Sequence, residues 1–528
     1  MKTPNNTPHI TPKYRNKRVD QWANILVICS ILLVLLLTLF PFQFYFKNPA
    51  LIDYRALIFS GIRYDYPIEI LANVVLFIPL GFALTCLIQK TKLEGIAAVI
   101  VIQALSTALS FTIEILQIFL PSRLPSLIDL LTNSVGAFIG FLCFRLWGVK
   151  ILSYASAIAE KCKGCLSLKK LTLAFIGYTT LSFLISIYFA NATNFWNLSN
   201  WDQTFPLLLG NEPTGDRPWR GHISELYIAD RAISEEEVAQ VFSENGLFAS
   251  IKDSLVGSYP LTGRGSYSDQ TGNLPDLSWK REPPEVQDER GVFLTPDHWL
   301  QTDTSVAYMT QKIRESSQFT LSATVATADT KQTGPARIIS ISHDPAIRNF
   351  TIGQEGTDLV FRLRTPLTGR GGTKPEIIVS NIFTDTNYHH LLITYSPSYF
   401  KVYVDNFENL YSLKMNPEFT LMWYLAHSGG RINIQNHPQN FYKLIYYGFI
   451  FIPMGFILAI ITTKMRGNLG FYLVLTFGGI LLPSLILQAI FVSVNGMEAK
   501  LENLFLSMFI TGGTLLLFKR QTASWFKS

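Results

Sequence analysis

Residues 71–88 read LANVVLFIPLGFALTCLI, a run without a charged side chain. Because a helix rises about 1.5 Å per residue, about 20 apolar residues cross the hydrocarbon core of a bilayer. Similar runs recur toward both ends of the chain. We predict an α-helical membrane bundle of eight transmembrane helices, at residues 23–42, 68–88, 95–119, 127–147, 171–190, 444–463, 469–494 and 501–518.

The composition agrees with a membrane protein that carries one soluble part. Of the 528 residues, 48% are hydrophobic and only 16% are charged, against roughly one quarter charged in soluble domains. Residues 191–440 differ, because their composition is that of a soluble domain. None of the five cysteines lies there, so this stretch must fold on its own core without a disulfide.

Basic residues in short connections predict the orientation, because such connections resist translocation. The chain has five groups of basic residues outside the apolar runs. One group precedes the first run and one follows the last. The other three lie in the connections between the second and third, the fourth and fifth, and the sixth and seventh runs. All five groups lie on one side in an eight-pass count. We therefore expect a protein of the cell (inner) membrane with a basic tail at 1–22, a loop at 151–170 and both termini in the cytoplasm, and with residues 191–440 outside. The net charge of +6 then reports topology and not nucleic-acid binding.

An internal repeat divides the helices into two groups of four. Phe77-Ile-Pro-Leu-Gly-Phe82 in the second run returns as Phe451-Ile-Pro-Met-Gly-Phe456 in the sixth. Each copy is followed by a short basic turn, by a run that contains a glutamine (Gln117 or Gln488), and by a last run with small residues. The alternative to a duplication is that this six-residue motif recurs by chance among apolar helices. The predicted repeats cover 23–150 and then 171–190 with 441–520.

The first repeat carries polar side chains inside three of its helices. Ser110, Glu114 and Gln117 follow i, i+4, i+7 spacing, which places them on one helix face. A carboxylate within a membrane costs about 3 kcal/mol or more when it is unpaired, so Glu114 should face the bundle and have a partner, for which Arg123 is the candidate. The predicted polar site consists of Asn73, Ser110, Glu114, Gln117, Arg123, Asp129 and Asn133.

Two interpretations of this polar site remain open. As a functional site it would bind an anionic or sugar-bearing headgroup, with Arg123 contacting the anion and with Glu114 and Asp129 accepting hydroxyls or a proton. As a structural network it would fix how the helices pack, which polar residues in membranes also do. The pattern assigns no catalysis, so an enzyme is the less favoured class.

The polar site also resembles a known family. Asn73-x-x-x-Phe77-x-Pro79-x-Gly81, Ser110-x-x-x-Glu114-x-x-Gln117, Arg123 and Asp129-x-x-x-Asn133-x-x-Gly136-x-x-x-Gly140 together are similar to the VanZ-like membrane proteins over about residues 25–147. The resemblance implies a bacterial envelope protein, in a family named for lowered susceptibility to the glycopeptide teicoplanin and without a settled biochemical activity. The second repeat departs from the pattern at the Glu, Arg and Asp positions, so any activity is expected in the first.

Between 250 and 430 the pattern changes to short alternating runs separated by Gly, Pro, Asp and Asn, which is typical of antiparallel strands. Many short strands without helices predict an all-β sandwich, here spanning 195–436. The clearest strands are expected at 319–325, 336–341, 349–352, 359–363, 391–395 and 400–404, the last two forming a hairpin.

Several phrases in this sandwich resemble the LamG or concanavalin A-like jelly roll, namely Leu255-Val-Gly-Ser-Tyr-Pro-Leu-Thr-Gly263, Phe319-Thr-Leu-Ser-Ala323 and Phe400-Lys-Val-Tyr-Val-Asp405. A phrase that normally closes such a domain begins here at Trp219, ahead of the others, which predicts a circular permutation. The alternative is that 200–247 is the remnant of a separate module. The resemblance implies binding of glycans or proteins. The Glu-x-Asp-x-x-Glu pattern of related glucanases is absent from the sequence, which favours binding over hydrolysis.

The binding residues and partners follow from this resemblance. The candidates for stacking on a sugar are Trp201, Trp219, Trp299 and Trp423. The alternative is that they are core residues, which is the more frequent role of tryptophan in a jelly roll. The candidates for calcium, with a spacing that is not diagnostic, are Asp202, Asp216 and Asp230. No other cofactor is expected. The expected partners are membrane lipids and an extracytoplasmic glycan or, for a protein-binding scaffold, an envelope protein.

Overall fold

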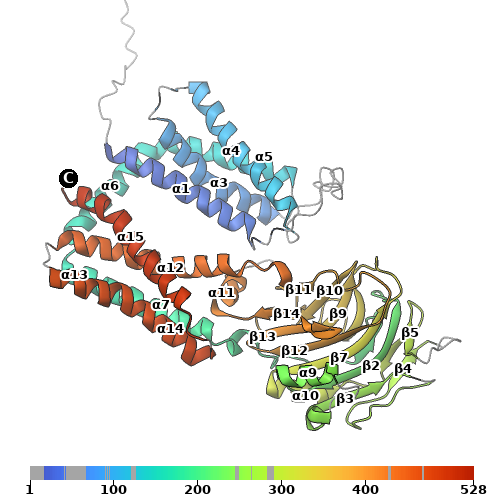
Figure 1. Cartoon of the computed structure of the whole chain (residues 1–528). Coiled ribbons are helices and arrows are strands. Elements are labelled where there is room, and N and C mark those ends of the chain that lie inside the picture. The colour runs from blue at the N-terminus through green and yellow to red at the C-terminus, as the bar shows by residue number, and fades with distance from the viewer. Residues whose placement is uncertain are drawn as a thin grey trace, which may run out of the picture. The chain divides into compact units, whose positions relative to one another are not determined.

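A computed structural model of the chain falls into two compact units, unit 1 (Met1–Leu166) and unit 2 (Ser167–Ser528), which are described separately (Figure 1). The described residues are 17–40, 42, 44, 67–89, 91, 93, 95–120, 126–243, 249–262, 265–281, 290–425, 430–465, 469–496 and 498–527.

Unit 1 is a helical bundle. Its core consists of aliphatic and aromatic side chains that α1, α3 and α4 direct at one another, among them Val34, Phe77, Leu80 and Ile113. The helices are α1 (Lys17–Leu39), α3 (Pro67–Ile88), α4 (Gly95–Ile118) and α5 (Leu127–Cys143), followed by the π-helical turn η3 (Phe144–Gly148) and α6 (Val149–Cys165).

Glycines let α3 and α5 cross in backbone contact. A Cβ atom on Gly81 would lie 2.0 Å from the carbonyl oxygen of Ala137, and one on Gly136 would lie 2.2 Å from that of Val74. Gly140 meets α3 in the same way one turn later. Small residues one turn apart permit such close approach of membrane helices, where packing takes the place of the hydrophobic effect.

The helices of unit 2 form a second bundle. Its core contains Tyr446, Tyr447, Phe451 and Met454 of α12, packed against Phe491 of α14. α12 crosses α15 at Gly455, where a Cβ atom would lie 2.5 Å from the carbonyl oxygen of Thr511. The helices are α7 (Leu168–Ala190), α12 (Gln439–Lys464), α13 (Leu469–Thr476), the π-helical turn η6 (Phe477–Leu481), α14 (Leu482–Asn495) and α15 (Leu501–Lys527).

Seven helical segments among the described residues are long and apolar enough to cross a membrane. The chain is therefore a multi-pass membrane protein, and these segments correspond to seven of the eight predicted passes. The first predicted pass corresponds to α1, whose described apolar part, Ala23–Leu39, falls short of that length. The seven are Ile70–Ile88, Gly95–Ile118, Leu127–Ile158, Leu168–Ala190, Gln439–Lys464, Gly470–Val494 and Leu501–Lys519.

The predicted loop at 151–170 is mostly helical. α5, η3 and α6 continue into one another, and only Leu166 and Ser167 separate α6 from α7. The helix was not foreseen, because the interpretation relied on the basic residues of this stretch, and its cytoplasmic location stays a prediction. Lysine, glutamate, alanine and leucine all favour a helix, so charge marks the end of an apolar run without ending the helix itself.

The inserted part of unit 2 is a sandwich of two sheets. The eight-stranded sheet has the order β15 (Arg431–Asn433), β11 (Glu376–Val379), β10 (Asp358–Leu363), β9 (Arg348–Glu355), β8 (Ala336–Ser342), β1 (Leu207–Leu209), β6 (Trp299–Thr302) and β4 (Leu277–Lys280). The seven-stranded sheet has the order β14 (Asn406–Lys414), β13 (Tyr399–Val404), β12 (His389–Ser396), β7 (Phe319–Thr327), β2 (Gly221–Ala229) and β3 (Leu255–Pro260), with β5 (Val292–Leu294) paired to β2.

Aromatic rings fill the space between the two sheets. The rings of Phe350 on β9 and Phe319 on β7 lie 6.0 Å apart, and those of Phe361 on β10 and Phe400 on β13 lie 4.7 Å apart. All six strands predicted most clearly are present, and β12 pairs with β13 as the predicted hairpin. Every second side chain of a strand points to the same face of its sheet. The inward-pointing side chains of the two sheets therefore form the core that holds the sandwich together.

The segment that precedes the LamG-like phrases is an integral part of the sandwich. β1 lies between β6 and β8 in one sheet, and β2 lies between β3 and β7 in the other. This central placement disfavours the alternative in which 200–247 is a remnant of a separate module. The sheets also carry the helices α8 (Thr193–Trp196), α9 (Glu235–Ser243), α10 (Ala307–Ser316) and α11 (Pro417–Leu425).

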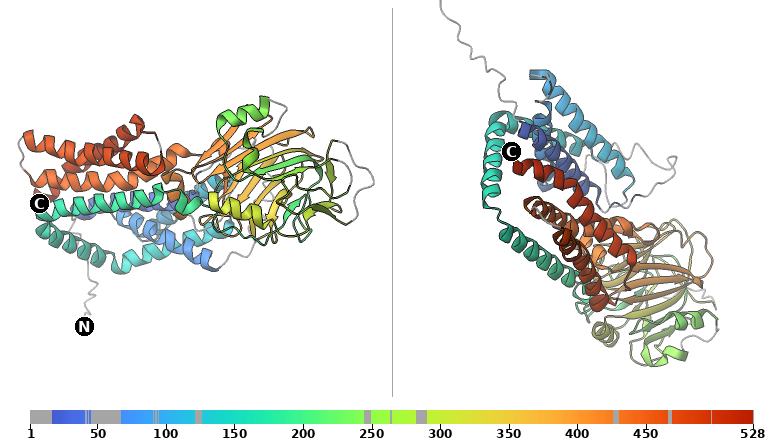
Figure 2. Two further views of the ribbon diagram at one scale, coloured as in Figure 1. Left: turned by 90° about the horizontal axis from the view of Figure 1, so that it is seen from below. Right: turned by 60° about the vertical axis from the view of Figure 1, so that its left-hand side comes forward.

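The expectation of a domain without helices was wrong, because short helices need only two or three buried side chains. α10, for example, buries Met309 and Ile313 four residues apart. α11 packs on α7 and α12, so the sandwich and the second bundle are continuous (Figure 2). On the sandwich side, the indole nitrogen of Trp196 donates to the hydroxyl of Thr420 on α11 over 3.0 Å. The sandwich is therefore not an isolated module.

Candidate functional site

Hydrogen bonds between side chains join three helices of unit 1. The Nδ2 atom of Asn73 on α3 donates to a carboxylate oxygen of Asp129 on α5 over 2.8 Å. The Nδ2 atom of Asn133 on α5 donates to the hydroxyl of Ser110 on α4 over 2.9 Å. Ser110 and Asn133 are buried, so the bond between them lies inside the bundle, whereas the bond between Asn73 and Asp129 is partly buried. The structure thus brings together four of the predicted site residues.

Glu114 belongs to the same cluster through the start of α5. Its Oε2 atom accepts a hydrogen bond of 2.8 Å from the backbone nitrogen of Ser126, the N-cap residue of α5. The Ser126 hydroxyl in turn accepts from the backbone nitrogen of Ile128. Asp129, in the first turn of α5, lies near enough to Glu114 for the two carboxylates to interact electrostatically. The partial positive charge of a helix N-terminus stabilises both carboxylates.

The other predicted members of the site have different positions. Gln117 donates from Nε2 to the backbone oxygen of Thr38 over 3.0 Å, so it ties α4 to α1. Arg123 lies outside the described residues, and its pairing with Glu114 stays a prediction. Ser126 was missed by the sequence analysis, although a serine just before an apolar run is a usual helix-start signal.

The cluster is suited to accepting hydrogen bonds. Glu114, Asp129 and Asn73 are only partly buried, whereas the Oδ1 atom of Asn133 is buried and has no hydrogen-bond partner among the described residues. The described members of the cluster include no lysine or arginine. Two carboxylates held at a helix start can therefore accept hydrogen bonds from hydroxyl or ammonium groups of a ligand.

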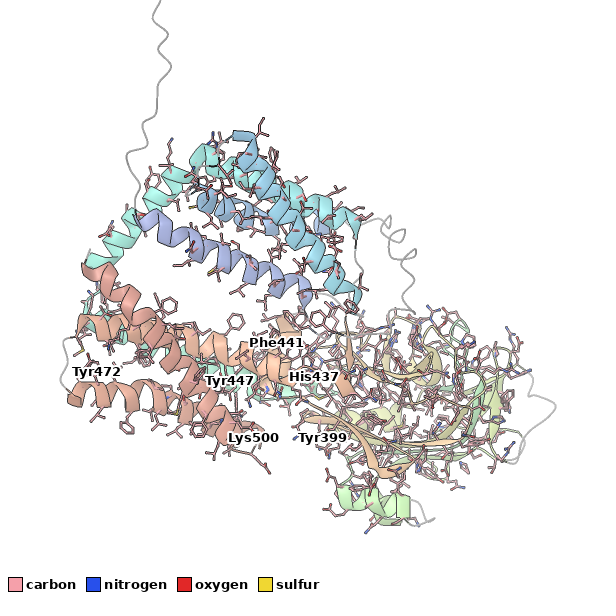
Figure 3. All side chains as sticks on the ribbon, turned by 45° about the horizontal axis from the view of Figure 1, so that its top comes forward. Tyr399, His437, Phe441, Tyr447, Tyr472 and Lys500 are labelled. Carbon is pink, nitrogen blue, oxygen red and sulfur yellow. The ribbon has the colours of Figure 1, made fainter. Side chains whose placement is uncertain are left out.

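The second bundle has tyrosines where the first has this cluster. Tyr447 occupies the position that corresponds to Asn73 in the repeated motif, four residues before its first phenylalanine. Its side chain is buried, and Tyr446 beside it donates to the hydroxyl of Ser186 over 2.9 Å. His437 lies just before α12 and Tyr447 further along that helix (Figure 3). These aromatic groups carry no negative charge themselves, and the buried carboxylate that interacts with both tyrosines is Glu418 on α11.

All four predicted sugar-stacking tryptophans are core residues in the sandwich and at its helical end. The indole nitrogens of Trp201 and Trp219 donate to the Arg364 backbone and the Gln354 side chain over 2.9 and 2.8 Å. The exposed fractions are 2% for Trp201, 0% for Trp219, 8% for Trp299 and 2% for Trp423. Because stacking needs an open ring face, the structure favours the core alternative for these residues.

Two of the three calcium candidates, Asp202 and Asp216, accept hydrogen bonds within their own loops. The Thr204 hydroxyl donates to Asp202 over 2.7 Å and lowers the pKa of that carboxyl, and Asp216 accepts from Thr214. Within the described ranges, no three His, Cys, Asp or Glu side chains gather as a metal site would require. Calcium binding by Asp202, Asp216 and Asp230 stays a prediction.

The comparisons with known proteins identify the N-terminal part of the chain. Residues 13–148 match the family model described as VanZ/LLP1, and this match contains every residue of the predicted polar site. Neither a curated protein nor a solved structure matches the chain. The protein is thus a multi-pass membrane protein with a VanZ-like part in unit 1 and a β-rich part in unit 2.

Proposed function

We propose that this protein is a bacterial envelope protein whose VanZ-like part binds the hydroxyl-bearing headgroup of a membrane lipid or lipid-linked saccharide. The observation that carries the proposal is the pair of carboxylates, Glu114 and Asp129, held together at the start of α5. Ionisable groups within membrane helices are costly, so two carboxylates placed together inside a bundle support a ligand-binding role. Sugar or glycerol hydroxyls can donate hydrogen bonds to these carboxylates.

The proposed topology brings the site and the sandwich to the same side of the membrane. Both termini and the basic connections are cytoplasmic in this proposal, with α1 as the first of eight passes and residues 191–440 outside. The positive-inside rule supports it, because the lysines and arginines of the short connections all fall on one side. Glu114 then opens toward the outer surface, where headgroups of exported lipids are presented.

The proposed architecture is a duplicated four-helix unit that displays a permuted jelly roll. The repeated Phe-Ile-Pro-x-Gly-Phe motif and the matching glycine crossings at Gly81 and Gly455 support the duplication. The central positions of β1 and β2 in the two sheets support the permutation. In the related fold the corresponding segment comes last in the sequence, whereas here it comes first and still lies inside the sheets.

Lipid retention by the full-length protein tests the headgroup proposal. The protein would be reconstituted in nanodiscs of phosphatidylcholine doped with equal amounts of glucosyl diacylglycerol and phosphatidylglycerol, and bound lipids counted by native mass spectrometry. We expect preferential retention of a hydroxyl-bearing lipid, reduced at least tenfold in Glu114→Gln and Asp129→Asn. Thr112→Ala, an exposed change on the same helix, is the matched control. Equal retention by all variants would contradict the proposal.

The second candidate function is glycan binding by the sandwich, as a lectin-like display domain. The two-sheet architecture supports it, while the buried tryptophans move the binding surface to other residues. Full-length protein in nanodiscs applied to a glycan array tests it. Binding to an envelope polysaccharide would support this function, and a blank array combined with a recovered protein partner would favour the scaffold alternative.

A further inference from the structure

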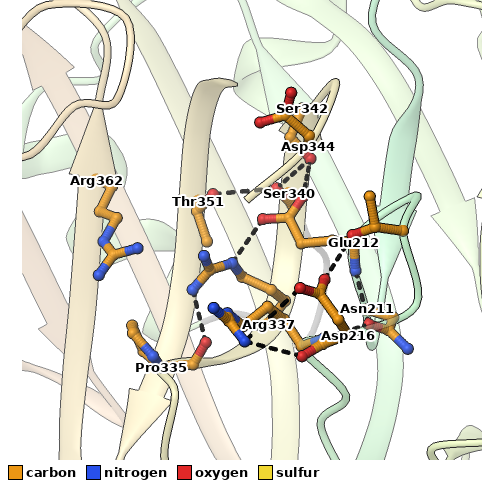
Figure 4. A network of polar contacts seen from close by, with 12 residues as sticks. Asn211, Glu212, Asp216, Pro335, Arg337, Ser340, Ser342, Asp344, Thr351 and Arg362 are labelled. Atoms are coloured by element: carbon orange, nitrogen blue, oxygen red, sulfur yellow. Dashed lines mark hydrogen bonds and ion pairs between the residues drawn. The ribbon is translucent and has the colours of Figure 1, made fainter. Parts of the chain in front are cut away.

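Three arginines occupy one face of the eight-stranded sheet: Arg337 on β8, Arg348 on β9 and Arg362 on β10, here called the arginine cluster. The strand register places them together. Arg362 lies directly opposite Thr351, and Arg348 lies opposite Ser342 where a register shift interrupts the regular alternation of β9. Arg348 is also close enough to Arg337 and Arg362 for their charges to interact. Directly opposed residues of neighbouring strands share a face, and the polar network on that face is drawn in Figure 4.

This face is turned away from the second sheet and yet is largely closed to solvent. Of the three arginines, Arg362 is the most exposed, with 15% of its side chain open to solvent. Phe350, a neighbour of Thr351 along β9, points to the other side and contacts Phe319 of the second sheet. On the arginine side, the hydroxyls of Ser340 and Thr351 lie 3.0 Å apart. The exposed fractions of Arg337 and Arg348 are 0% and 1%. The arginine cluster is therefore an internal polar site of the sandwich.

The two carboxylates near the cluster are already engaged. Glu212 pairs with Arg337 over 2.6 Å and also accepts from the hydroxyl of Ser342. Glu376 pairs with Arg362, and it also pairs with Arg431 over 2.8 Å. Positive charges outnumber negative ones, and the described residues provide no ion pair for Arg348.

Arg348 is the group that this arrangement leaves unsatisfied. Its Nε and Nη1 atoms are buried and have no hydrogen-bond partner among the described residues. Burial, with the like charges of Arg337 and Arg362 nearby, lowers the pKa of Arg348 to about 10, which still leaves it charged at neutral pH. An unpaired buried charge is strongly unfavourable, and guanidinium groups are best satisfied by oxygens of an anion.

We propose that the arginine cluster binds a small oxyanion, a carboxylate, phosphate or sulfate group, to which the Nε and Nη1 atoms of Arg348 donate. The anion balances the excess positive charge and satisfies the buried donors. The same group can arrive as a free inorganic ion or as the acidic substituent of a sugar. This site is separate from the polar cluster of unit 1, and it does not rest on the headgroup proposal.

Direct binding to the full-length protein in detergent is the first test. Equilibrium dialysis with radiolabelled sulfate should show saturable binding of about one ion per chain. Acetate and glucuronate should displace the label, whereas chloride at equal ionic strength should not. A tenfold advantage of glucuronate over acetate would indicate a sugar-borne carboxylate, and equal competition a free anion. Absence of saturable sulfate binding to the native protein would overturn the proposal and leave water as the partner of Arg348.

Substitution locates the site. Arg348→Met should lower sulfate affinity at least tenfold, and Lys331→Met, which removes one exposed positive charge from the same domain, should not. Sulfate should also raise the melting temperature of the native protein saturably, by about 5 °C, and leave that of Arg348→Met unchanged. If Arg348→Met does not fold, Arg348→Lys retains the charge and is used instead. A folded Arg348 variant that binds sulfate as tightly as the native protein would refute the assignment.

Discussion

The two helical bundles of this protein share a way of packing but not a polar interior. In unit 1, Gly81 lets α3 meet the backbone of α5, and in unit 2, Gly455 lets α12 meet that of α15. Around the first crossing lie Asn73 and Asp129, bonded to each other, whereas Tyr447 takes the place of Asn73 in the second. Helix contact depends on small residues at a few positions, so the remaining positions are free to differ. This difference is the reason why we propose a ligand site in the first bundle and not in the second.

The largest effect is expected from filling the first crossing. Gly81→Ala places a Cβ atom 2.0 Å from the Ala137 carbonyl oxygen, and only separation of the helices relieves that overlap. We expect a loss of about 3 kcal/mol in the free energy of unfolding, and a smaller loss for Gly455→Ala, whose Cβ atom would lie 2.5 Å from the Thr511 oxygen.

Thermal unfolding of the full-length protein in detergent measures both crossings. Gly177→Ala on α7 is the control, because a Cβ atom there meets nothing within 4 Å. If Gly81→Ala proved as stable as this control, the backbone contact between α3 and α5 would not exist.

The polar pair of the first bundle should matter more than its counterpart in the second. Asn73→Leu removes the donor to Asp129 and leaves that carboxylate without this hydrogen bond, at a cost of about 1–3 kcal/mol. Tyr447→Phe removes a buried hydroxyl that has no hydrogen-bond partner among the described residues, so we expect no loss of stability. Chemical denaturation of both variants checks this difference. Equal destabilisation would show that the two bundles are polar to the same degree.

A pH dependence is expected in unit 2, where His437 lies largely buried just before α12. Burial lowers the pKa of His437 from 6.5 to about 4. Because the folded state then binds the proton less readily than the unfolded state, its stability is full above pH 6.5 and is lost as the pH falls toward 4, by about 3 kcal/mol.

The measurement is the melting temperature of unit 2, followed by tryptophan fluorescence between pH 7 and 4. His437→Gln should flatten the profile, since glutamine does not titrate in this range. An unchanged slope in that variant would assign the pH dependence to other groups.

The smallest effect is expected from the charged pair of the second bundle. Lys443 on α12 and Glu502 on α15 lie 4.0 Å apart, and the Glu502 side chain is 85% exposed. Lys443→Met should therefore change the free energy of unfolding by no more than about 0.5 kcal/mol. A larger loss in a thermal melt would show that charge holds this bundle together as hydrogen bonds hold the first.

Much of the fold could be predicted from local patterns. The apolar run around Phe77 indicates a helix, and the alternating run of Phe319 to Val325 indicates a strand. In both cases a few neighbouring residues are enough for the prediction. The helix α6 could not be recognised in this way, because its lysines resembled the end of a membrane pass. The hydrogen bond from Ser126 to Glu114 also escaped prediction, since the backbone nitrogen of Ser126 comes close only when α5 begins just after that residue.

The amino-acid sequence by itself determined the apolar helices, the strands of the sandwich and the VanZ-like polar residues, because hydrophobic periodicity and residue type act over short distances. Only the tertiary structure decided that the four tryptophans are buried, that β1 and β2 lie inside the sheets, and that Arg348 is enclosed beside Arg337 and Arg362. The physical reason is that burial and charge pairing depend on which distant segments meet, and no local pattern records that encounter.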